Sequence, residues 1–272
     1  MCDTCGCNVT YGNQHLIRPG GKLARAPGGR EAVEVLSGLL SENDHQAAHN
    51  REHFDRHGVL ALNLMSSPGS GKTALLEATI RALAGELRVA VVEGDLETEN
   101  DAERIRAAGA PAVQITTGSA CHLDAHMVHD ALHHLDLESV DVVFIENVGN
   151  LVCPASFDLG HHRNVTLLSV TEGDDKPAKY PVMFRAADLM LLTKTDLLPV
   201  IEEFSPQRAE TAVRHLANPA PVLRVSAKKG DGMKAWLKWL RAEVTAQRAR
   251  GARGETVRPA MQRDGIRLHA GG

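Results

Sequence analysis

SSPGSGKT, residues 66–73, stands between the apolar run LALNLM and the helical pattern ALLEATIRALAG, and this stretch decides the fold. A glycine-rich turn between a strand and a helix is the context of a phosphate-binding loop, because its backbone N–H groups and the helix dipole both face phosphate oxygens. The first position is Ser66 rather than the usual Gly. The alternative, a glycine-rich turn with an incidental lysine, is disfavoured by the flanking strand and helix. The residues expected to contact the nucleotide are Gly69, Ser70, Gly71, Lys72 and Thr73.

Phosphoryl transfer depends on the positioning of metal and water, and the sequence offers residues for both. Lys72 is expected to reach the β- and γ-phosphates, and Thr73 to ligate Mg²⁺ through its hydroxyl. Glu146 follows the run VVFI and is expected to hold the ion directly or through water. Asp95, which ends VVEGD, is expected to share the ion or orient the attacking water, and Gly149 to offer its N–H to the γ-phosphate. Either acid alone could instead be a helix cap or a loop carboxylate.

Seven short apolar runs alternate with longer amphipathic stretches from residue 59 onward. This rhythm predicts right-handed crossovers and an α/β fold, a three-layer P-loop domain whose mainly parallel sheet is covered by helices on both faces. Ligands of such sheets bind at the carboxyl ends of the strands, where the motifs fall. The predicted strands are VLALNLM, VAVVEGD, AVQIT, VDVVFIEN, VTLLSVT, ADLMLLTKTD and VLRVSA.

The nucleotide base is predicted from two loops near the end of the chain. Asp196, in TKTDLL, resembles the aspartate of the guanine-reading N-K-x-D motif, whose oxygens match the N1–H and the exocyclic amine of guanine. Lys194 is expected to lay its apolar stem across the base. Thr193 replaces the asparagine of that motif. Ser226 and Ala227, in SAKKGDG, resemble the loop that supports guanine, so the sequence favours GTP over ATP; the alternative for each is an ordinary polar loop.

A first group of candidate metal ligands lies at the start of the chain, where Cys2, Cys5 and Cys7 fall within six residues. Thiolates select Ni²⁺, Zn²⁺ or Cu⁺ over Mg²⁺ and Ca²⁺. Removal of the initiator methionine would free an amine as a fourth donor, and a planar four-coordinate site would suit Ni²⁺. The alternative is an unstructured, oxidation-prone tail.

A second group comprises Cys121, His122 and Cys153, with His126 one turn beyond His122 on the helix predicted over HLDAHMVHDALHHL. Three sulfur or nitrogen ligands are one short of a closed zinc site, so water, His126 or a second subunit could complete it for Ni²⁺ or Zn²⁺. Cys153 and Gly149 share one short loop, and loss of GTP is therefore expected to shift a metal ligand. The alternative is a pair of buried structural thiols.

Other histidines recur at helical spacing and are predicted to form a solvated face rather than a metal site. Weak metal binding is the alternative for them. They are His45, His49, His53 and His57 in one segment, and His129, His133 and His134 in another.

The length, composition and net charge of the chain indicate its broad class. Its 272 residues are 43% hydrophobic with a net charge of −4, so it carries no overall basic field and no nucleic-acid partner is expected. No stretch has the apolar length of a signal peptide core or a membrane span, which predicts a cytoplasmic protein without a membrane partner. In a reducing compartment, cysteines are better interpreted as metal ligands or catalytic thiols than as disulfides.

Five segments are predicted along the chain. Residues 1–7 form the cysteine motif and 8–30 a flexible linker. A pair of short helices over 31–58 packs beside the P-loop domain at 59–245. Residues 246–272 are a basic tail predicted to be disordered.

The motifs together resemble the HypB family of GTPases that incorporate nickel into hydrogenases. The resemblance implies a fold of the signal-recognition-particle and nitrogenase-iron-protein-like class, and a homodimer that forms with GTP and metal. It implies a tight nickel site at Cys2, Cys5 and Cys7, and a nickel or zinc site at Cys121, His122 and Cys153. The matching stretches are CDTCGC, SSPGSGKT, EGD, CHLDAH, FIENVGNLVCPASFDLG, SVTEGDDKPAKYP, LLTKTDLLP and SAKKGDGM.

The implied activity is GTP hydrolysis that drives delivery of nickel, with a HypA-type metallochaperone, to the large subunit of a nickel-iron hydrogenase. Two alternatives stay open at this point. One is a urease-accessory-type GTPase, which is not expected to have the N-terminal thiols. The other is a nickel storage or buffering protein with a vestigial nucleotide site.

Overall fold

The structure is a computed structural model, and it describes residues 17–18, 22–23, 30–95, 100–118 and 120–260, with side chains from residue 40 onward except that of Asp95. Seven strands form one sheet and two short ones pair separately as an antiparallel ribbon. The strands are β1 (Ile17–Arg18), β2 (Lys22–Leu23), β3 (Leu60–Met65), β4 (Val89–Asp95), β5 (Ala112–Thr116), β6 (Val142–Glu146), β7 (Arg163–Ser169), β8 (Leu189–Thr193) and β9 (Val222–Arg224).

The seven-stranded sheet has the order β5-β4-β6-β3-β7-β8-β9, and every neighbouring pair is parallel. All seven predicted runs form strands of this sheet, so the predicted α/β class is confirmed. The strand β3, which leads into the P-loop, lies between β6 and β7 at the centre. Ligand-bearing loops after β3, β4 and β6 therefore emerge side by side at one edge of the sheet.

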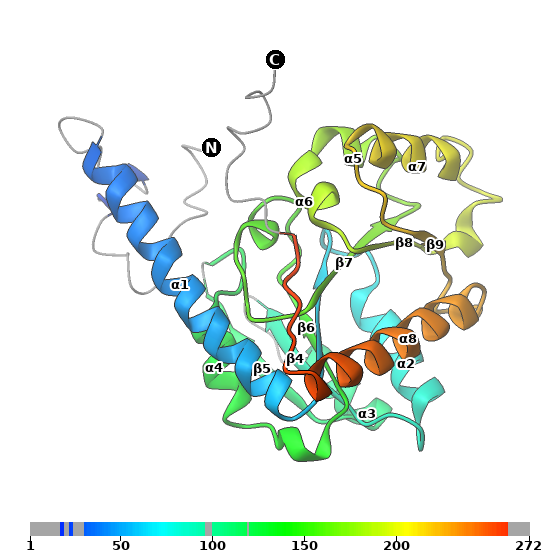
Figure 1. Cartoon of the computed structure of the whole chain (residues 1–272). Coiled ribbons are helices and arrows are strands. Elements are labelled where there is room, and N and C mark those ends of the chain that lie inside the picture. The colour runs from blue at the N-terminus through cyan, green and yellow to red at the C-terminus, as the bar shows by residue number, and fades with distance from the viewer. Residues whose placement is uncertain (1–16, 19–21, 24–29, 96–99, 119, 261–272) are drawn as a thin grey trace.

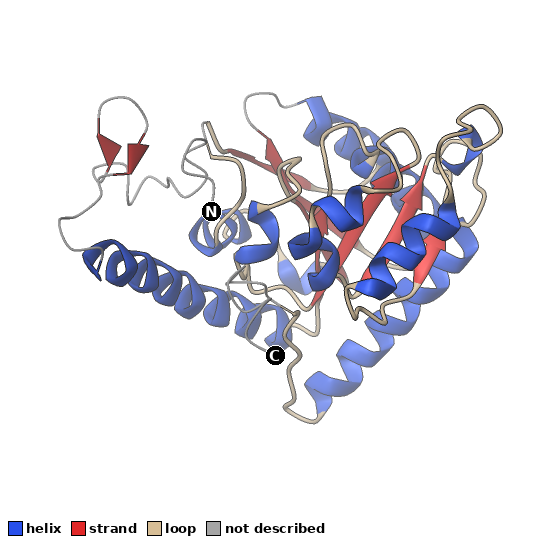
Figure 2. Cartoon of the chain, turned by 90° about the horizontal axis from the view of Figure 1, so that it is seen from above, coloured by secondary structure: helices blue, strands red, loops and turns tan. Residues whose placement is uncertain are grey.

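Helices cover both faces of the sheet (Figures 1 and 2). One face packs on α2, α3 and α8; the other packs on α1 and α4 near β4 and β6, and on α6 and α7 near β7 and β8. Within β3, Leu60, Leu62 and Leu64 face the first side, and Ala61 and Met65 the second. The helices are α1 (Arg30–Arg56), α2 (Lys72–Leu83), α3 (Asn100–Ala108), α4 (Ala125–Leu132), α5 (Lys176–Lys179), α6 (Pro181–Ala186), α7 (Pro206–His215) and α8 (Met233–Ala252).

The N-terminal extension differs from its prediction. Residues 30–56 form one helix, α1, and not a pair. Its buried polar side chains fix it to the body: Asn50 donates to the carbonyls of Ala125 and Leu159, and Arg51 forms an ion pair with buried Asp158 at 2.6 Å. The prediction of a structureless linker over 8–30 is wrong at the four residues of β1 and β2. The cysteine motif over 1–7 lies outside the described residues.

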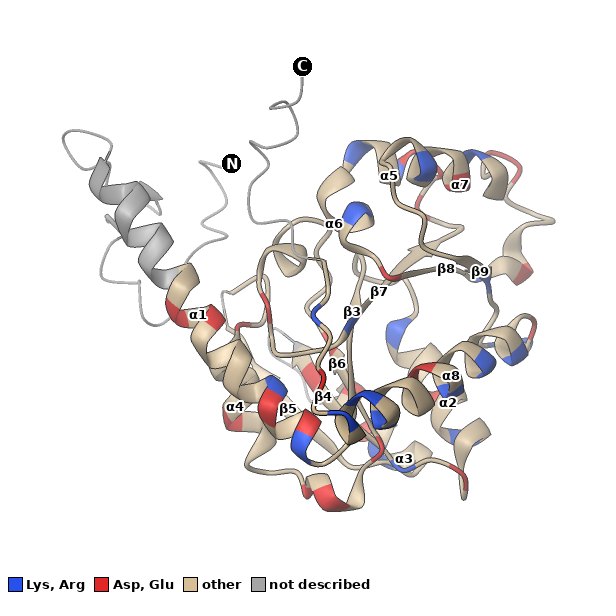
Figure 3. Cartoon of the chain, in the orientation of Figure 1, with Lys and Arg blue, Asp and Glu red and all other residues tan. Residues whose placement is uncertain are grey.

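The basic C-terminal segment also differs, because α8 continues through residue 252 and the described chain runs to 260. Buried Gln247 donates to Asp55 at 2.6 Å, and Arg248 lies 2.8 Å from Asp141. Figure 3 shows the basic residues at this end of α8 in blue. Their partners belong to the folded body, so the predicted disordered tail is wrong for 246–260. Among the helices that the structure describes, none is long and apolar enough to cross a bilayer.

Replacing Trp236 by Phe is expected to lower the free energy of unfolding by about 1 to 3 kcal/mol. The indole is fully buried and its Nε1–H donates to Thr79 Oγ1 at 2.8 Å, so the variant loses a hydrogen bond and leaves a void. Urea unfolding followed by circular dichroism measures the change. The matched control is Trp239→Phe on the same helix, because Trp239 is only partly buried and stacks on Trp236. Equal losses in the two variants would contradict this account.

Candidate functional site

The P-loop between β3 and α2 has the backbone its glycines require. Gly69 has φ 72° and Gly71 φ 95°, values in the left-handed region that only glycine adopts without strain. The amine of Lys72 lies 3.1 Å from Ser66 Oγ, so the serine in place of the usual first glycine contributes a hydrogen-bond acceptor. Ser70 Oγ also donates to Ser66 Oγ, at 2.5 Å. The side chain of Ser66 therefore links the start of the loop to its end.

Two buried acids lie beside the start of α2. The Thr73 hydroxyl donates to Glu146 Oε1 at 3.1 Å, and Lys72 Nζ lies 4.0 Å from the same oxygen. Glu93 of β4, which the sequence analysis did not single out, has a carboxylate oxygen within 4.8 Å of those of Glu146 and Asp101. The structure thus brings together Lys72, Thr73 and Glu146 as predicted, and adds Glu93.

Glu93 and Glu146 share a site that water does not reach. Burial, and then the charge of Glu146, raise the pKa of Glu93 to about 11. Burial also raises the pKa of Glu146, while the charge of Lys72 lowers it. We infer that Glu93 holds a proton near neutral pH.

The chemistry of this site fits Mg²⁺. The Oε2 atom of Glu146 is buried without a hydrogen-bond partner, and with the Thr73 hydroxyl it offers hard oxygen ligands. Asp95, predicted to share the ion, is the last residue of β4, and its side chain lies outside the described residues.

The loop after β6 touches both the P-loop and the segment before α4. A Cβ on Gly149 would lie 2.8 Å from Pro68 Cα, so this approach to the P-loop requires glycine. Asn147 Oδ1 accepts from the backbone N–H of Leu123 at 3.1 Å, and Asn147 Nδ2 donates to Asn63 Oδ1. Residues 146–149 are therefore fixed on one side by the nucleotide loop and on the other by the residue that follows His122.

The predicted guanine loops lie against the P-loop and against each other. Thr193 Oγ1 donates to Ser70 O at 2.6 Å, so the threonine ties β8 to the P-loop although it replaces asparagine. Lys194, at φ 56°, donates to Gly69 O at 2.6 Å. Ser226 Oγ donates to Asp196 Oδ1 at 2.7 Å. This bond holds the Asp196 carboxylate, and the half-buried Ala227 follows directly.

Two cysteines and a histidine meet on the loops before α4 and after β6. Their ligand atoms all lie within 4.8 Å of one another, with Cys121 Sγ 3.4 Å from Cys153 Sγ and 3.7 Å from His122 Nδ1. Two thiolates each about 2.3 Å from one ion stand about 3.3 to 3.8 Å apart, so the observed separation matches a pair of metal ligands and is too long for a disulfide. His122 stacks on Phe157, and its buried Nε2 has no hydrogen-bond partner.

His126 does not join this group, which corrects the predicted fourth ligand. Asp124 caps α4, which begins at Ala125, so Cys121 and His122 precede the helix instead of opening it. The spacing of four residues between His122 and His126 is therefore not one helical turn. His126 is exposed, and the groups within 4.8 Å of one another do not include it among the described residues.

In metal-free protein, alkylation of Cys121 is expected to show a midpoint near pH 5. Hydrogen bonding between Cys121 and Cys153, and then between Cys121 and His122, lowers the pKa of Cys121 to about 5, so the reactive thiolate forms above that pH and is lost below it. Quantifying the Cys121 peptide by mass spectrometry after iodoacetamide pulses gives the profile. In Cys153→Ala the midpoint should move up toward the ordinary thiol range, about 8.5. A midpoint in that range in the unsubstituted protein would contradict the prediction.

A sequence profile of the CobW/HypB/UreG nucleotide-binding domain matches residues 60–224, more than half of the chain. The hydrogenase maturation factor HypB of Azotobacter vinelandii is 52% identical over 248 residues, 90% of this chain and 80% of the relative. That of Escherichia coli (strain K12) is 50% identical over 217 residues, 80% of this chain and 74% of the relative.

Two solved structures are similar over 75% of this chain. HypB from Helicobacter pylori in complex with nickel is 42% identical, with a TM-score of 0.72 over 96% of its chain. The hydrogenase maturation factor HypB from Archaeoglobus fulgidus is 38% identical, with a TM-score of 0.70 over its whole length. The P-loop site, the thiol pair and these similarities agree, and the chain belongs to the HypB family of hydrogenase maturation factors.

Proposed function

We propose that this chain is a GTP-hydrolysing nickel metallochaperone, which delivers Ni²⁺ to the large subunit of a nickel-iron hydrogenase during maturation. The nickel complex of the Helicobacter pylori relative supports a metal cargo. The buried Lys72, Thr73 and Glu146 support nucleotide hydrolysis. The thiol and imidazole group next to the nucleotide loop supports the link between the two.

In the nucleotide site, Lys72 and the P-loop N–H groups bind and orient the β- and γ-phosphates. Thr73 and Glu146 would hold Mg²⁺, which when bound neutralises charge on the phosphate oxygens. Asp95 either shares that ion or orients the attacking water. Glu93 keeps its proton beside Glu146.

Guanine is the base that this site favours. An aspartate carboxylate accepts two hydrogen bonds at once, and guanine offers N1–H and an amine side by side where adenine does not. The bond from Ser226 Oγ leaves Asp196 Oδ2 and the second lone pair of Oδ1 for the base. Lys194 and Thr193 hold the same loop against the P-loop, so the base and phosphate sites form one unit.

The metal cargo is proposed to bind Cys121, His122 and Cys153, with an open position for a water or for a ligand from a second subunit. Two thiolates and one imidazole suit Ni²⁺ or Zn²⁺ and not Mg²⁺. The thiolate character of Cys121 supports this assignment, because a thiolate, and not a thiol, is the metal ligand.

One observation carries the proposal: residues 146–153 contact the P-loop and supply a metal ligand. Glu146 accepts from Thr73, Gly149 packs on Pro68, and Cys153 lies 3.4 Å from Cys121. A change at the γ-phosphate that moves Gly149 therefore moves Cys153, four residues later. This is the physical basis for coupling GTP hydrolysis to nickel release.

Nickel is expected to bind the GTP-loaded and GDP-loaded proteins with affinities that differ by about 5- to 150-fold, the usual range for two coupled sites. Calorimetric titration of Ni²⁺ into protein loaded with a non-hydrolysable GTP analogue, and separately with GDP, measures both constants. The same titrations with Zn²⁺ show whether the affinity for Ni²⁺ or the affinity for Zn²⁺ depends on the bound nucleotide. Equal affinities in the two nucleotide states would contradict the proposed function.

The remaining assignments complete the proposal. Cys2, Cys5 and Cys7 form a further tight nickel site, a HypA-type metallochaperone is the partner, and GTP with metal drives homodimerisation in the cytoplasm. GTP turnover separates this function from nickel storage, which requires several bound ions per chain and no hydrolysis. Activation of hydrogenase rather than urease separates it from a urease-accessory-type GTPase.

A further inference from the structure

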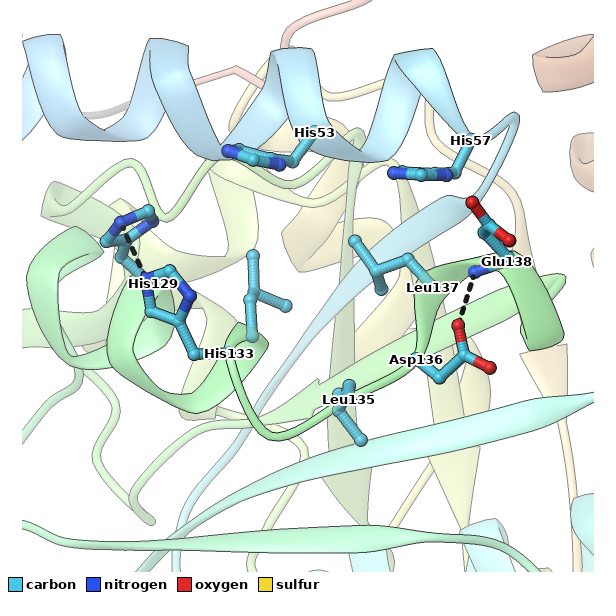
Figure 4. Close-up of a pocket in the computed structure, with 9 residues that line it drawn as sticks. His53, His57, His129, His133, Leu135, Asp136, Leu137 and Glu138 are labelled. Atoms are coloured by element: carbon cyan, nitrogen blue, oxygen red, sulfur yellow. Dashed lines mark hydrogen bonds between the residues drawn. The ribbon is translucent and has the colours of Figure 1, made fainter.

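A cluster of four histidines lies between α1 and α4, two helices on the face of the sheet away from α8 (Figure 1). Figure 4 shows three of the four: His53, His129 and His133. The ring centroid of His129 is 4.7 Å from that of His133 and 5.0 Å from that of His49. His53 lies 4.6 Å from His49 and 6.0 Å from His129. The predicted solvated face holds for His49 and His133, which are exposed, whereas His53 and His129 are half-buried.

The nitrogens of two of these rings are spaced as ligands of one ion. His129 Nε2 and His133 Nε2 are 3.2 Å apart. Two imidazole nitrogens each about 2.0 to 2.1 Å from a metal, at an angle of about 90 to 110°, stand about 2.9 to 3.4 Å apart. A hydrogen bond between the two rings would give a similar distance. The tautomer of His129 therefore decides whether its Nε2 carries a proton or a lone pair.

Asn50 fixes that tautomer. Its Nδ2 donates to the carbonyls of Ala125 and Leu159, at 2.8 and 3.1 Å, so its Oδ1 must be the acceptor that faces His129 Nδ1 at 3.0 Å. His129 therefore carries its proton on Nδ1, and its Nε2 presents a lone pair toward His133. An oxygen that accepts the second ring N–H is the partner that commonly orients a metal-binding histidine.

Metal binding requires neutral imidazole rings, and the surroundings of His129 and His53 favour the neutral form. Burial, and then the neighbouring histidine His133, lowers the pKa of His129. Burial, and then His49, lowers the pKa of His53. His133 and His49 are exposed, so solvent reaches the cluster from one side.

We propose that His129 and His133 bind a divalent transition metal ion of the nickel or zinc class, with His49 and His53 lining the site beyond the two ligands. Imidazole nitrogens suit both ions, and an all-nitrogen site open to solvent exchanges its ion more readily than a closed thiolate site. This site is separate in residues and in ligand chemistry from the cysteine sites. It adds to the proposed function and does not depend on it.

Equilibrium dialysis of the full chain against Ni²⁺ alone, and separately against Zn²⁺ alone, tests the site. The double variant His129→Gln/His133→Gln is expected to bind one ion fewer per chain than the unsubstituted protein. Its thiolate-to-nickel charge-transfer absorption should be unchanged, because the cysteine sites keep their ligands. The matched control His134→Gln removes an adjacent exposed histidine and should lose no ion.

Unchanged ion counts in the double variant would overturn the proposal and leave an inter-ring hydrogen bond as the whole interaction. If the double variant does not fold, the single variant His133→Gln decides, because His133 is exposed at the end of α4. Chemical modification of the unsubstituted protein gives an independent reading. Ni²⁺ should protect His129 and His133 from diethyl pyrocarbonate and leave His134 reactive, and equal reactivity of all three would also overturn it.

Discussion

Substitution of Lys72 by alanine is expected to lower kcat for GTP hydrolysis by about 100- to 1000-fold, the usual cost of removing one charge-stabilising donor from an active site. The lysine is buried, and its amine lies between Ser66 Oγ and Glu146 Oε1, where the P-loop turns into α2. No other described lysine or arginine forms an ion pair with Glu146. Phosphate release at saturating GTP and Mg²⁺ measures the effect.

Arg81→Ala is the matched control for this loss. Arg81 lies in the last turn of the same helix, its side chain is 62% exposed, and its partner is Glu77 at 3.9 Å. Turnover in the control should equal that of the unsubstituted protein. Hydrolysis by Lys72→Ala at the rate of the control would show that SSPGSGKT is not the catalytic phosphate loop.

The sheet could be predicted from the sequence because its strands are buried on both faces. Every residue of β3, β6 and β8 is buried, and apart from Asn63, Glu146 and Thr193 these strands are apolar, which is typical of a parallel sheet covered on both faces. The P-loop could be predicted equally well, because its glycines and Lys72 lie in one short stretch whose conformation depends on local geometry alone.

The helix boundaries of the extensions were harder to predict. The stretch 30–56 has interruptions in its apolar pattern, and its polar Asn50 and Arg51 read as surface residues. Partners such as Leu159 and Asp158 lie more than a hundred residues away in sequence, so no local window could reveal that these side chains are buried. The arginines of α8 were misread as a free tail for the same reason.

In the site, the spacing of residues in the sequence gave the wrong prediction for His126. The contacts that Glu93 makes with residues distant in sequence were not predicted. The helical interpretation of CHLDAH failed because Asp124 starts the helix two residues after His122. Glu93 did leave a signal, since a carboxylate inside an otherwise apolar strand is costly to bury without a purpose. Thr193 stands where the motif has an asparagine, yet its hydroxyl reaches the P-loop. Only the position of β8 in the sheet, next to β7 and one strand away from β3, could reveal this contact.

Replacing Cys153 by alanine is expected to weaken nickel binding at the Cys121 site by more than the about 10- to 100-fold that the loss of an outer-shell partner costs. The substitution removes one of three ligands and also the hydrogen bond that keeps Cys121 a thiolate. The ratio of nickel affinities in the GTP and GDP states should fall to about 1, because the ion no longer contacts the loop that carries Gly149. GTP turnover should persist, since Lys72 and Glu146 are unchanged.

Val152→Ala is the control for this variant, because it alters the same loop at a side chain that is 48% exposed. It should keep both the nickel affinity and its dependence on nucleotide. Comparison of the two variants distinguishes the loss of a metal ligand from a general disturbance of the loop. Loss of nickel binding in both variants would assign the effect to the structure of the loop. If Cys153→Ala retained the nucleotide-dependent difference, coupling would have to pass through Asn147 and Leu123 to His122 instead of through the thiol.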